Sequence, residues 1–213
     1  MSLRKHPASL IVLVSAPSGA GKTSLVRELM ARDGNLKMGI SHTTRPLRGD
    51  ERDGHDYYFV SRQEFLAMRE RGEFLESAEV FGHLYGTSRP MIEALACDGS
   101  DVVLEIDTQG ASQLRAKGFA DASVFILPPA LDSLANRLTG RASDAKSVID
   151  GRLAEAKREM SHYKDYDYVL VNEDFETAAR ALGDVIRAER CRTRKMEIKR
   201  DALLRSLTEG EGI

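Results

Sequence analysis

A glycine-rich run that ends in Lys-Thr-Ser is the first feature of this sequence that could carry chemistry. Its residues are Ala16, Pro17, Ser18, Gly19, Ala20, Gly21, Lys22, Thr23 and Ser24. Gly19 and Gly21 allow the backbone to curl, so that several N–H groups point inward at phosphate oxygens. Lys22 can reach the β and γ oxygens of a nucleoside triphosphate, and the Thr23 hydroxyl can ligate Mg²⁺. We therefore expect this run to bind a nucleoside triphosphate.

The elements on either side of this run are those that a phosphate-binding loop requires. Residues 10–14 are a continuous apolar run rich in β-branched side chains, which predicts a strand buried on both faces. From Lys22 onward, apolar residues recur at helical spacing as far as Asp33–Gly34. This order of strand, turn and helix favours phosphate binding over a turn that only caps a helix. Ala16 stands where the pattern has its first glycine, and a small residue there can still shape the turn.

A second cationic group lies in the loop that begins at Ser41. Arg45 and Arg48 flank Pro46 and are three residues apart. Guanidinium groups bind phosphate oxygens in a bidentate manner, so the pair can hold a second phosphate group. Two solvated surface arginines are the alternative. The glycine-rich run alone is compatible with a GTPase, an ATPase or a kinase, and a second phosphate site favours a kinase with a phosphorylated acceptor.

The elements that must position these residues predict an α/β fold. We expect a P-loop NTPase of three α/β/α layers with a mostly parallel sheet, because apolar runs at 101–107, 123–127 and 168–171 alternate with helical segments. Short pieces mixing Gly, Pro, Tyr and charged residues predict a small inserted α+β subdomain at 39–90, and a helical, Arg-bearing stretch predicts a lid at 133–165. The core would then comprise residues 1–38, 91–132 and 166–213. From Phe175 to Leu207 the pattern predicts a long charged helix or a helix pair.

Composition narrows the classes of partner. The chain has 213 residues and a formal net charge of −2, from 31 Lys and Arg against 33 Asp and Glu. That balance provides no global field to hold nucleic acid or an anionic membrane. The longest apolar run is too short to span a bilayer, and the first residues do not resemble a targeting peptide, so we expect a cytoplasmic protein. Cys97 and Cys191 lie far apart, which predicts free thiols and no structural zinc.

Several further blocks are similar to one known family. They are the segments 54–60, 74–76, 81–88, 106–110, 126–129, 137–141 and 167–172. In order and spacing, together with the glycine-rich run, they closely resemble the guanylate kinase family over nearly the whole chain. The resemblance implies an ATP:GMP phosphotransferase of purine nucleotide metabolism, which makes GDP and which we expect to accept dGMP also. Its substrates would be ATP and GMP, with Mg²⁺ as the cofactor.

The resemblance also implies residues for the acceptor. Those that would hold the GMP phosphate are Ser41, Arg45, Arg48, Tyr57 and Tyr85, and those that would read guanine are Glu76, Thr87 and Asp107. Guanine presents adjacent N1–H and N2–H₂ donors that one carboxylate can accept together, whereas adenine offers an acceptor at that edge. Leaving such buried groups unpaired costs about 1–3 kcal/mol each. Taken alone, the tyrosines could simply pack the subdomain, and Glu76 could be a surface carboxylate.

For the donor, the resemblance implies a lid that closes over the ATP phosphates. Its arginines would be Arg137, Arg141 and Arg152, which with Lys22 and Arg45 would stabilise the transferred phosphoryl group. Helix-surface charge is the alternative for the lid arginines. Asn172 would contact adenine, although it could equally be a turn residue. Glu105 replaces an aspartate common in the family, and we expect it to reach Mg²⁺ through water.

Three rival interpretations remain open from the sequence. The acceptor could be AMP, dTMP or a non-nucleotide, and the pair Glu76 and Thr87 is what discriminates among these. A catalytically inactive guanylate-kinase-like scaffold module is disfavoured because Lys22 and Thr23 are present, and a regulatory GTPase because no Asn-Lys-x-Asp motif occurs.

The basic stretch 187–195 could contact nucleic acid, but interspersed acidic residues favour a solvated helix.

Overall fold

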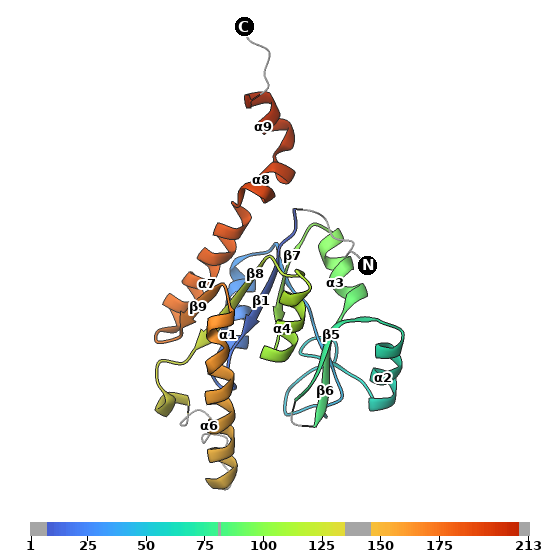
Figure 1. Cartoon of the computed structure of the whole chain (residues 1–213), viewed down its shortest axis with the longest axis vertical. Coiled ribbons are helices and arrows are strands. Elements are labelled where there is room, and N and C mark those ends of the chain that lie inside the picture. Colours follow the sequence, from blue (N-terminus) through green and yellow to red (C-terminus); the bar gives the residue numbers. More distant parts are fainter. Residues whose placement is uncertain (1–7, 81, 135–145, 209–213) are drawn as a thin grey trace.

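The computed structural model describes residues 8–80, 82–134 and 146–208 (Figure 1). Its larger sheet has five parallel strands in the order β2-β7-β1-β8-β9. Their bounds are β1 Ile11–Ser15, β2 Leu36–Met38, β7 Asp101–Glu105, β8 Ala122–Leu127 and β9 Tyr168–Val171. The helices on the two faces of this sheet complete the three α/β/α layers, and the predicted fold class is confirmed.

The position of β1 at the centre of the sheet explains why its sequence is apolar throughout. Val12 and Val14 of β1 belong to one buried cluster, while Ile11 and Leu13 belong to the other. The first cluster packs the sheet against α1 (Lys22–Arg32) and α7 (Phe175–Arg190). The second packs it against α3 (Arg89–Cys97) and α4 (Thr108–Ala116). A strand covered by helices on both faces has no polar side, so it shows no alternation.

Strand β2 was not predicted. It has three residues at the edge of the sheet and pairs with β7 from Leu36, which is buried, to Met38. Lys37 between them is exposed. A strand this short carries too little pattern to be recognised, and only its pairing with β7 defines it.

The segment between β2 and α3 forms a second sheet, which has four strands in the order β4-β3-β6-β5. Its elements are β3 His42–Thr43, β4 Tyr58–Phe59, α2 Arg62–Glu70, β5 Phe74–Val80 and β6 His83–Ser88. Phe65 of α2 stacks on Phe74 with ring centroids 4.4 Å apart. A Cβ at Gly86 would lie 2.9 Å from both rings, so only glycine allows β6 this close to them. The subdomain limits 39–90 and the lid limits 133–165 stay predictions.

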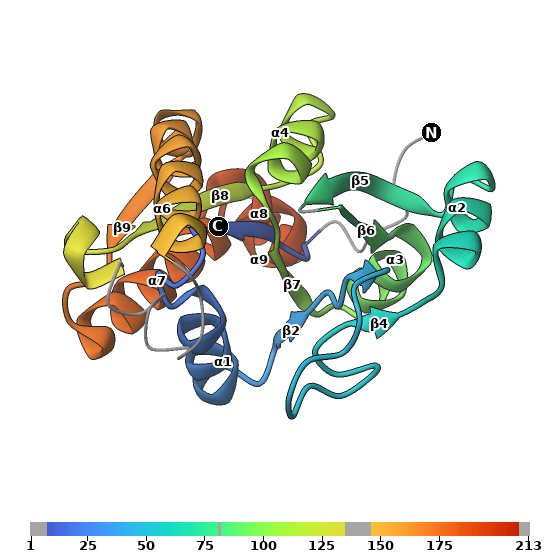
Figure 2. The ribbon, with the colours of Figure 1, turned by 90° about the horizontal axis from the view of Figure 1, so that it is seen from below.

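Helix α4 joins the second sheet to the first. Gln113 donates to the carbonyl of Ser77 at 3.0 Å, and Lys117 donates to the carbonyl of Leu75 at 2.6 Å. Figure 2 shows α4 between the two sheets, next to β5. These bonds hold β5 on both sides of Glu76 against the core, which fixes where that side chain lies.

The C-terminal segment forms three helices, not the one or two that the sequence predicted. After α7 come α8 (Thr193–Lys199) and α9 (Asp201–Thr208), which extend away from the sheets in Figure 1. Lys195 is buried and donates to the carbonyl of Ser9 at 2.6 Å, beside the Asp121 carboxylate at 3.0 Å. Other basic side chains of this stretch are also ion-paired, as Arg190 is with Asp101 at 2.6 Å. They are therefore not grouped as a free cationic face.

Between β8 and β9 the described part has a helical turn at residues 131–134 and two further elements. The further elements are α6 (Lys146–Ser161) and the short 3₁₀ helix η1 (His162–Asp165). Among the described residues, no helix has the length and apolar character needed to cross a bilayer. Cys97 and Cys191 are both exposed, and neither is in a disulfide within the described part of the chain.

Candidate active site

The glycine-rich run forms a curled loop between β1 and α1. Gly19 and Gly21 have φ angles of 87° and 93°, in the left-handed region that favours glycine. Gly21 is the N-cap of α1, so Lys22 and Thr23 lie in the first turn, at the positive end of the helix dipole. The loop therefore has the backbone shape and the helix terminus that bind phosphate.

Asn172 braces this loop from behind. Its side chain is 4% exposed and donates from Nδ2 to the carbonyl of Ala20 at 2.8 Å. A Cβ at Gly21 would lie 2.6 Å from that Nδ2, so glycine is required for the approach. This hydrogen bond shows that Asn172 holds the shape of the loop. Its contact with adenine stays a prediction.

Most of the predicted site residues line one cavity of about 890 Å³. Those that line it are Ala16, Pro17, Ser18, Gly19, Gly21, Lys22, Thr23, Ser24, Ser41, Arg45, Arg48, Tyr57, Glu76, Tyr85, Glu105, Asp107 and Asn172. Ala20 and Thr87 lie behind its wall and contact it through Asn172 and Glu76. Arg137 and Arg141 lie outside the described residues, as does the side chain of Arg152. The phosphate loop and the second sheet thus face one shared space.

One end of the cavity is built around a buried carboxylate. Glu76 is 6% exposed and accepts a hydrogen bond from the Thr87 hydroxyl at 2.6 Å. Burial raises the pKa of Glu76 to about 7, and the nearby charge of Asp107 adds to the rise. Asp107 caps α4 by accepting from the Gly110 amide at 2.7 Å. A Cβ at Gly110 would lie 2.5 Å from Glu76 Oε2, so the turn of α4 packs directly on the carboxylate.

At the opposite end of the second sheet, aromatic rings surround a buried arginine. Arg45 is 6% exposed, and its guanidinium lies 5.3 Å from the Tyr57 ring centroid. The rings of Tyr57 and Tyr85 meet edge to face, with centroids 5.9 Å apart. Burial raises the pKa of Tyr57 to about 12, so its hydroxyl remains a donor at neutral pH. The guanidinium and both rings face the cavity.

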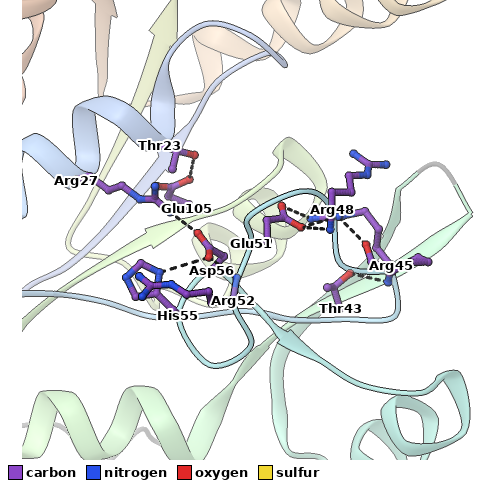
Figure 3. Close-up of polar contacts among 11 residues, drawn as sticks. Thr23, Arg27, Thr43, Arg45, Arg48, Glu51, Arg52, His55, Asp56 and Glu105 are labelled. Atoms are coloured by element: carbon purple, nitrogen blue, oxygen red, sulfur yellow. Dashed lines mark hydrogen bonds and ion pairs between the residues drawn. The ribbon is translucent and has the colours of Figure 1, made fainter. Parts of the chain in front are cut away.

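An oxygen-rich position lies where β7 ends beside the phosphate loop. The Thr23 hydroxyl donates to Glu105 Oε2 at 2.7 Å (Figure 3). Glu105 Oε1 is buried and has no hydrogen-bond partner among the described residues. The Thr23 hydroxyl and the unsatisfied carboxylate oxygen of Glu105 are oxygen ligands of the kind that suit Mg²⁺. Among the described residues no cluster of three His, Cys, Asp or Glu side chains could hold a metal by itself, so an ion here would depend on the nucleotide as well.

Four acidic residues that line the cavity were missed from the sequence, namely Glu51, Glu159, Glu173 and Asp174, and two of them have charged partners in the site. Glu51 pairs with Arg45, and Glu159 of α6 faces the phosphate loop. Burial raises the pKa of Glu159, while the Ser18 backbone N–H and the charge of Lys22 lower it. No local pattern marks either residue, because the partners of Glu159 are distant in the sequence and Arg45 lies across a loop turn from Glu51. Figure 3 shows Glu51 next to Arg45 and Arg48.

Comparison with known proteins decides the family. The guanylate kinase family model matches residues 8–189. The chain belongs to the guanylate kinase family. It is 50% identical to the guanylate kinase of Nitrosomonas europaea over 196 residues, which are 92% of this chain and 98% of that one. It is 52% identical to that of Alkalilimnicola ehrlichii over 191 residues, which are 90% and 94% of the two chains.

A solved structure extends this similarity to the fold. The crystal structure of guanylate kinase from Anaplasma phagocytophilum superposes with a TM-score of 0.76 at 34% identity, and the match covers 96% of this chain and 97% of that one. The resemblance stated from the sequence is therefore confirmed. Family membership covers the larger sheet and the second sheet together, since the match spans nearly all of the chain.

Proposed function

We propose that this chain transfers the terminal phosphate of ATP to GMP, which yields ADP and GDP. The observation that carries the proposal is the cavity shared by the phosphate loop and by the second sheet, with Arg45 and Glu76 at separate places on its wall. A nucleoside monophosphate bound there would meet cations with its phosphate and a buried carboxylate with its base. Both substrates would then face one another across a single space, as direct transfer requires.

The base preference follows from the chemistry of Glu76. Its ionised carboxylate would accept N1–H and N2–H₂ of guanine, and Thr87 beside it fixes its orientation through their 2.6 Å hydrogen bond. Adenine would place a lone pair against the carboxylate and leave a buried charge unpaired. None of the proposed contacts is to the sugar 2′-hydroxyl, so dGMP would serve as an acceptor as well.

The chemical step needs little beyond placement and positive charge. An oxygen of the GMP phosphate attacks the γ-phosphorus of ATP, and the bond from that phosphorus to the bridging oxygen of ADP breaks. The GMP phosphate is already anionic, so no general base is required. Lys22 and the backbone N–H groups of the loop would stabilise the charge on the β and γ oxygens. Arg45 would orient the acceptor phosphate, and the lid residues Arg137, Arg141 and Arg152 are proposed to close over the transferred group.

Thr23 and Glu105 are the residues that would hold Mg²⁺, with Glu105 acting through water. Mg²⁺ held there would neutralise negative charge that develops on the phosphates during transfer. We also propose the cytoplasm as the compartment, and ATP and GMP as the partners rather than nucleic acid or membrane.

An acceptor panel tests this function. The purified protein is mixed with ATP, Mg²⁺ and one of GMP, AMP, CMP, UMP or dTMP, and ADP is followed by a coupled assay. We expect GMP-dependent ADP release that Lys22→Ala reduces by at least about 100-fold, because the loop cation is lost. ADP release with another acceptor would retain the phosphate loop and refute the base-reading role. No turnover with any acceptor, despite GMP binding, would favour the scaffold module.

A further inference from the structure

Glu51 forms hydrogen bonds with both of the arginines that are predicted to hold the acceptor phosphate. Its carboxylate accepts from both terminal nitrogens of Arg45, at 2.9 Å from Nη1 and 2.7 Å from Nη2. It also accepts from the backbone N–H of Arg48 at 2.9 Å. One side chain therefore fixes the guanidinium plane of the first arginine and the main chain of the second.

The location of this pair distinguishes it from an ordinary surface ion pair. The Arg45 side chain is 6% exposed, and the Glu51 side chain, at 26%, still lines the cavity. Nη1 of Arg45 donates to the Pro46 carbonyl at 2.8 Å as well, so Glu51 and Pro46 together engage both ends of the fork. A bidentate pair held at this burial restricts the rotation of the guanidinium far more than an exposed pair does.

The loop around Glu51 is itself closed by short local bonds. The Glu51 amide donates to the Arg48 carbonyl at 3.0 Å, and the Arg52 amide donates to Asp56 at 2.8 Å. Asp56 in turn pairs with Arg27 of α1, which ties the loop to the core (Figure 3). Glu51 is thus anchored at its main chain as well as at its carboxylate, and it is well placed to set the position of other groups.

We infer that Glu51 is a positioning residue for the acceptor phosphate, which it serves by holding the Arg45 guanidinium and the Arg48 main chain in place. The inference rests on the proposed function, because it assigns that phosphate to GMP. Glu51 need not touch the substrate. Its carboxylate orders two donors before the phosphate arrives, so less freedom is lost when GMP binds. Since Arg45 holds the pKa of the Glu51 carboxyl below its usual value, the group stays ionised throughout the working pH range.

The test compares Glu51→Gln with a matched control in the same subdomain. Glu73 forms an exposed bidentate pair with Arg71, at 2.5 and 3.2 Å, and lies outside the cavity wall. We expect Glu51→Gln to raise the KM for GMP by about tenfold or more, since charge-assisted bonds to Arg45 are weakened. The KM for ATP and the ligand-free melting temperature should stay near those of the wild type. Glu73→Gln should leave every one of these quantities unchanged.

Further outcomes separate the inference from a purely structural role. Glu51→Asp keeps the charge and should recover part of the GMP affinity that Glu51→Gln loses. An unchanged KM for GMP in Glu51→Gln overturns the inference, and a lowered one shows that Glu51 competes with the phosphate, which also overturns it. If both variants lose their melting transition, Glu51 is structural and the inference fails. A wild type that does not turn over GMP refutes the proposed function itself, independently of the variants.

Discussion

Glu76 is a residue at which function and stability oppose each other. Its carboxylate is buried, and burial raises its pKa from the ordinary value of 4.5 to about 7. Between these two pH values the folded protein holds a proton that the unfolded chain has lost. Above pH 7 the folded state carries a buried charge whose solvation the unfolded chain would retain. The proposed guanine contact would supply the partners that this charge lacks in the free protein.

Replacement of Glu76 by Gln should therefore stabilise the ligand-free protein at high pH. One pKa unit corresponds to about 1.4 kcal/mol, so the free energy of unfolding of Glu76→Gln should exceed that of the wild type by roughly 1–3 kcal/mol at pH 8. At pH 4.5 the difference should vanish, because the wild-type carboxyl is then protonated in the folded state. Urea unfolding at several pH values measures it. A difference independent of pH would show that the carboxylate carries no such cost.

At the scale of the element, the start of helix α4 sets the shape of the cavity around Glu76, where we propose that guanine binds. Asp107 caps the helix, and Gly110 in its first turn allows Glu76 to approach the backbone. Any larger residue at 110 must displace the carboxylate, because the added Cβ would lie 2.5 Å from Oε2 and 2.8 Å from Ile106. Because Gly110 has no side chain, the helix would thereby contribute to the proposed recognition of guanine.

Gly110→Ala should weaken GMP use with little effect on ATP. We expect the KM for GMP to rise by about tenfold, since a displaced carboxylate loses its paired hydrogen bonds to guanine. Gly151→Ala in α6 is the matched control, because a Cβ there meets no atom within 4 Å. It should leave both KM values unchanged and can stabilise its helix by up to about 1 kcal/mol. Equal effects of the two changes on GMP would contradict the account.

The elements also differ in how far the sequence could predict them. Strands β1, β7 and β8 were predicted because parallel strands covered on both faces are continuous apolar runs. Strand β9 was predicted from a similar apolar run, although Val169 and Val171 are exposed at the edge of the sheet. Strands β3 and β4 have two residues each, and β2 has three, so none of them is long enough to repeat the two-residue alternation of a strand. Their existence depends on pairing with partners far along the chain, which a local pattern cannot show.

At the scale of the whole molecule, the same distinction applies to the site. Residues that belong to a short sequence motif, such as Lys22 with its neighbouring glycines, could be predicted from their spacing alone. The pairing of Glu51 with Arg45 and the approach of Glu159 to the phosphate loop could not, because the fold creates these contacts. Asn172 was predicted for the base of ATP, and its bond to Ala20 shows a bracing role that only packing reveals.

The two sheets together determine what the molecule can do. Ties from α4 to β5 and from Arg27 to Asp56 connect the second sheet and its loops to the core on two sides of the cavity. Exposed ion pairs such as that of Arg27 contribute at most about 1 kcal/mol, so the contacts of α4 carry more of the connection. The cavity is lined by residues of both parts, so it exists only where the two parts are present together.

Direct transfer between two bound nucleotides is the central claim, and isotopic labelling tests it most directly. The protein is incubated with ATP labelled at the γ-phosphate, Mg²⁺ and GMP, and the products are separated by chromatography. We predict that the label appears in the β-phosphate of GDP, with little released as inorganic phosphate, and that Lys22→Ala abolishes the transfer. Label found mainly in inorganic phosphate, or GDP that remains unlabelled, would contradict the account.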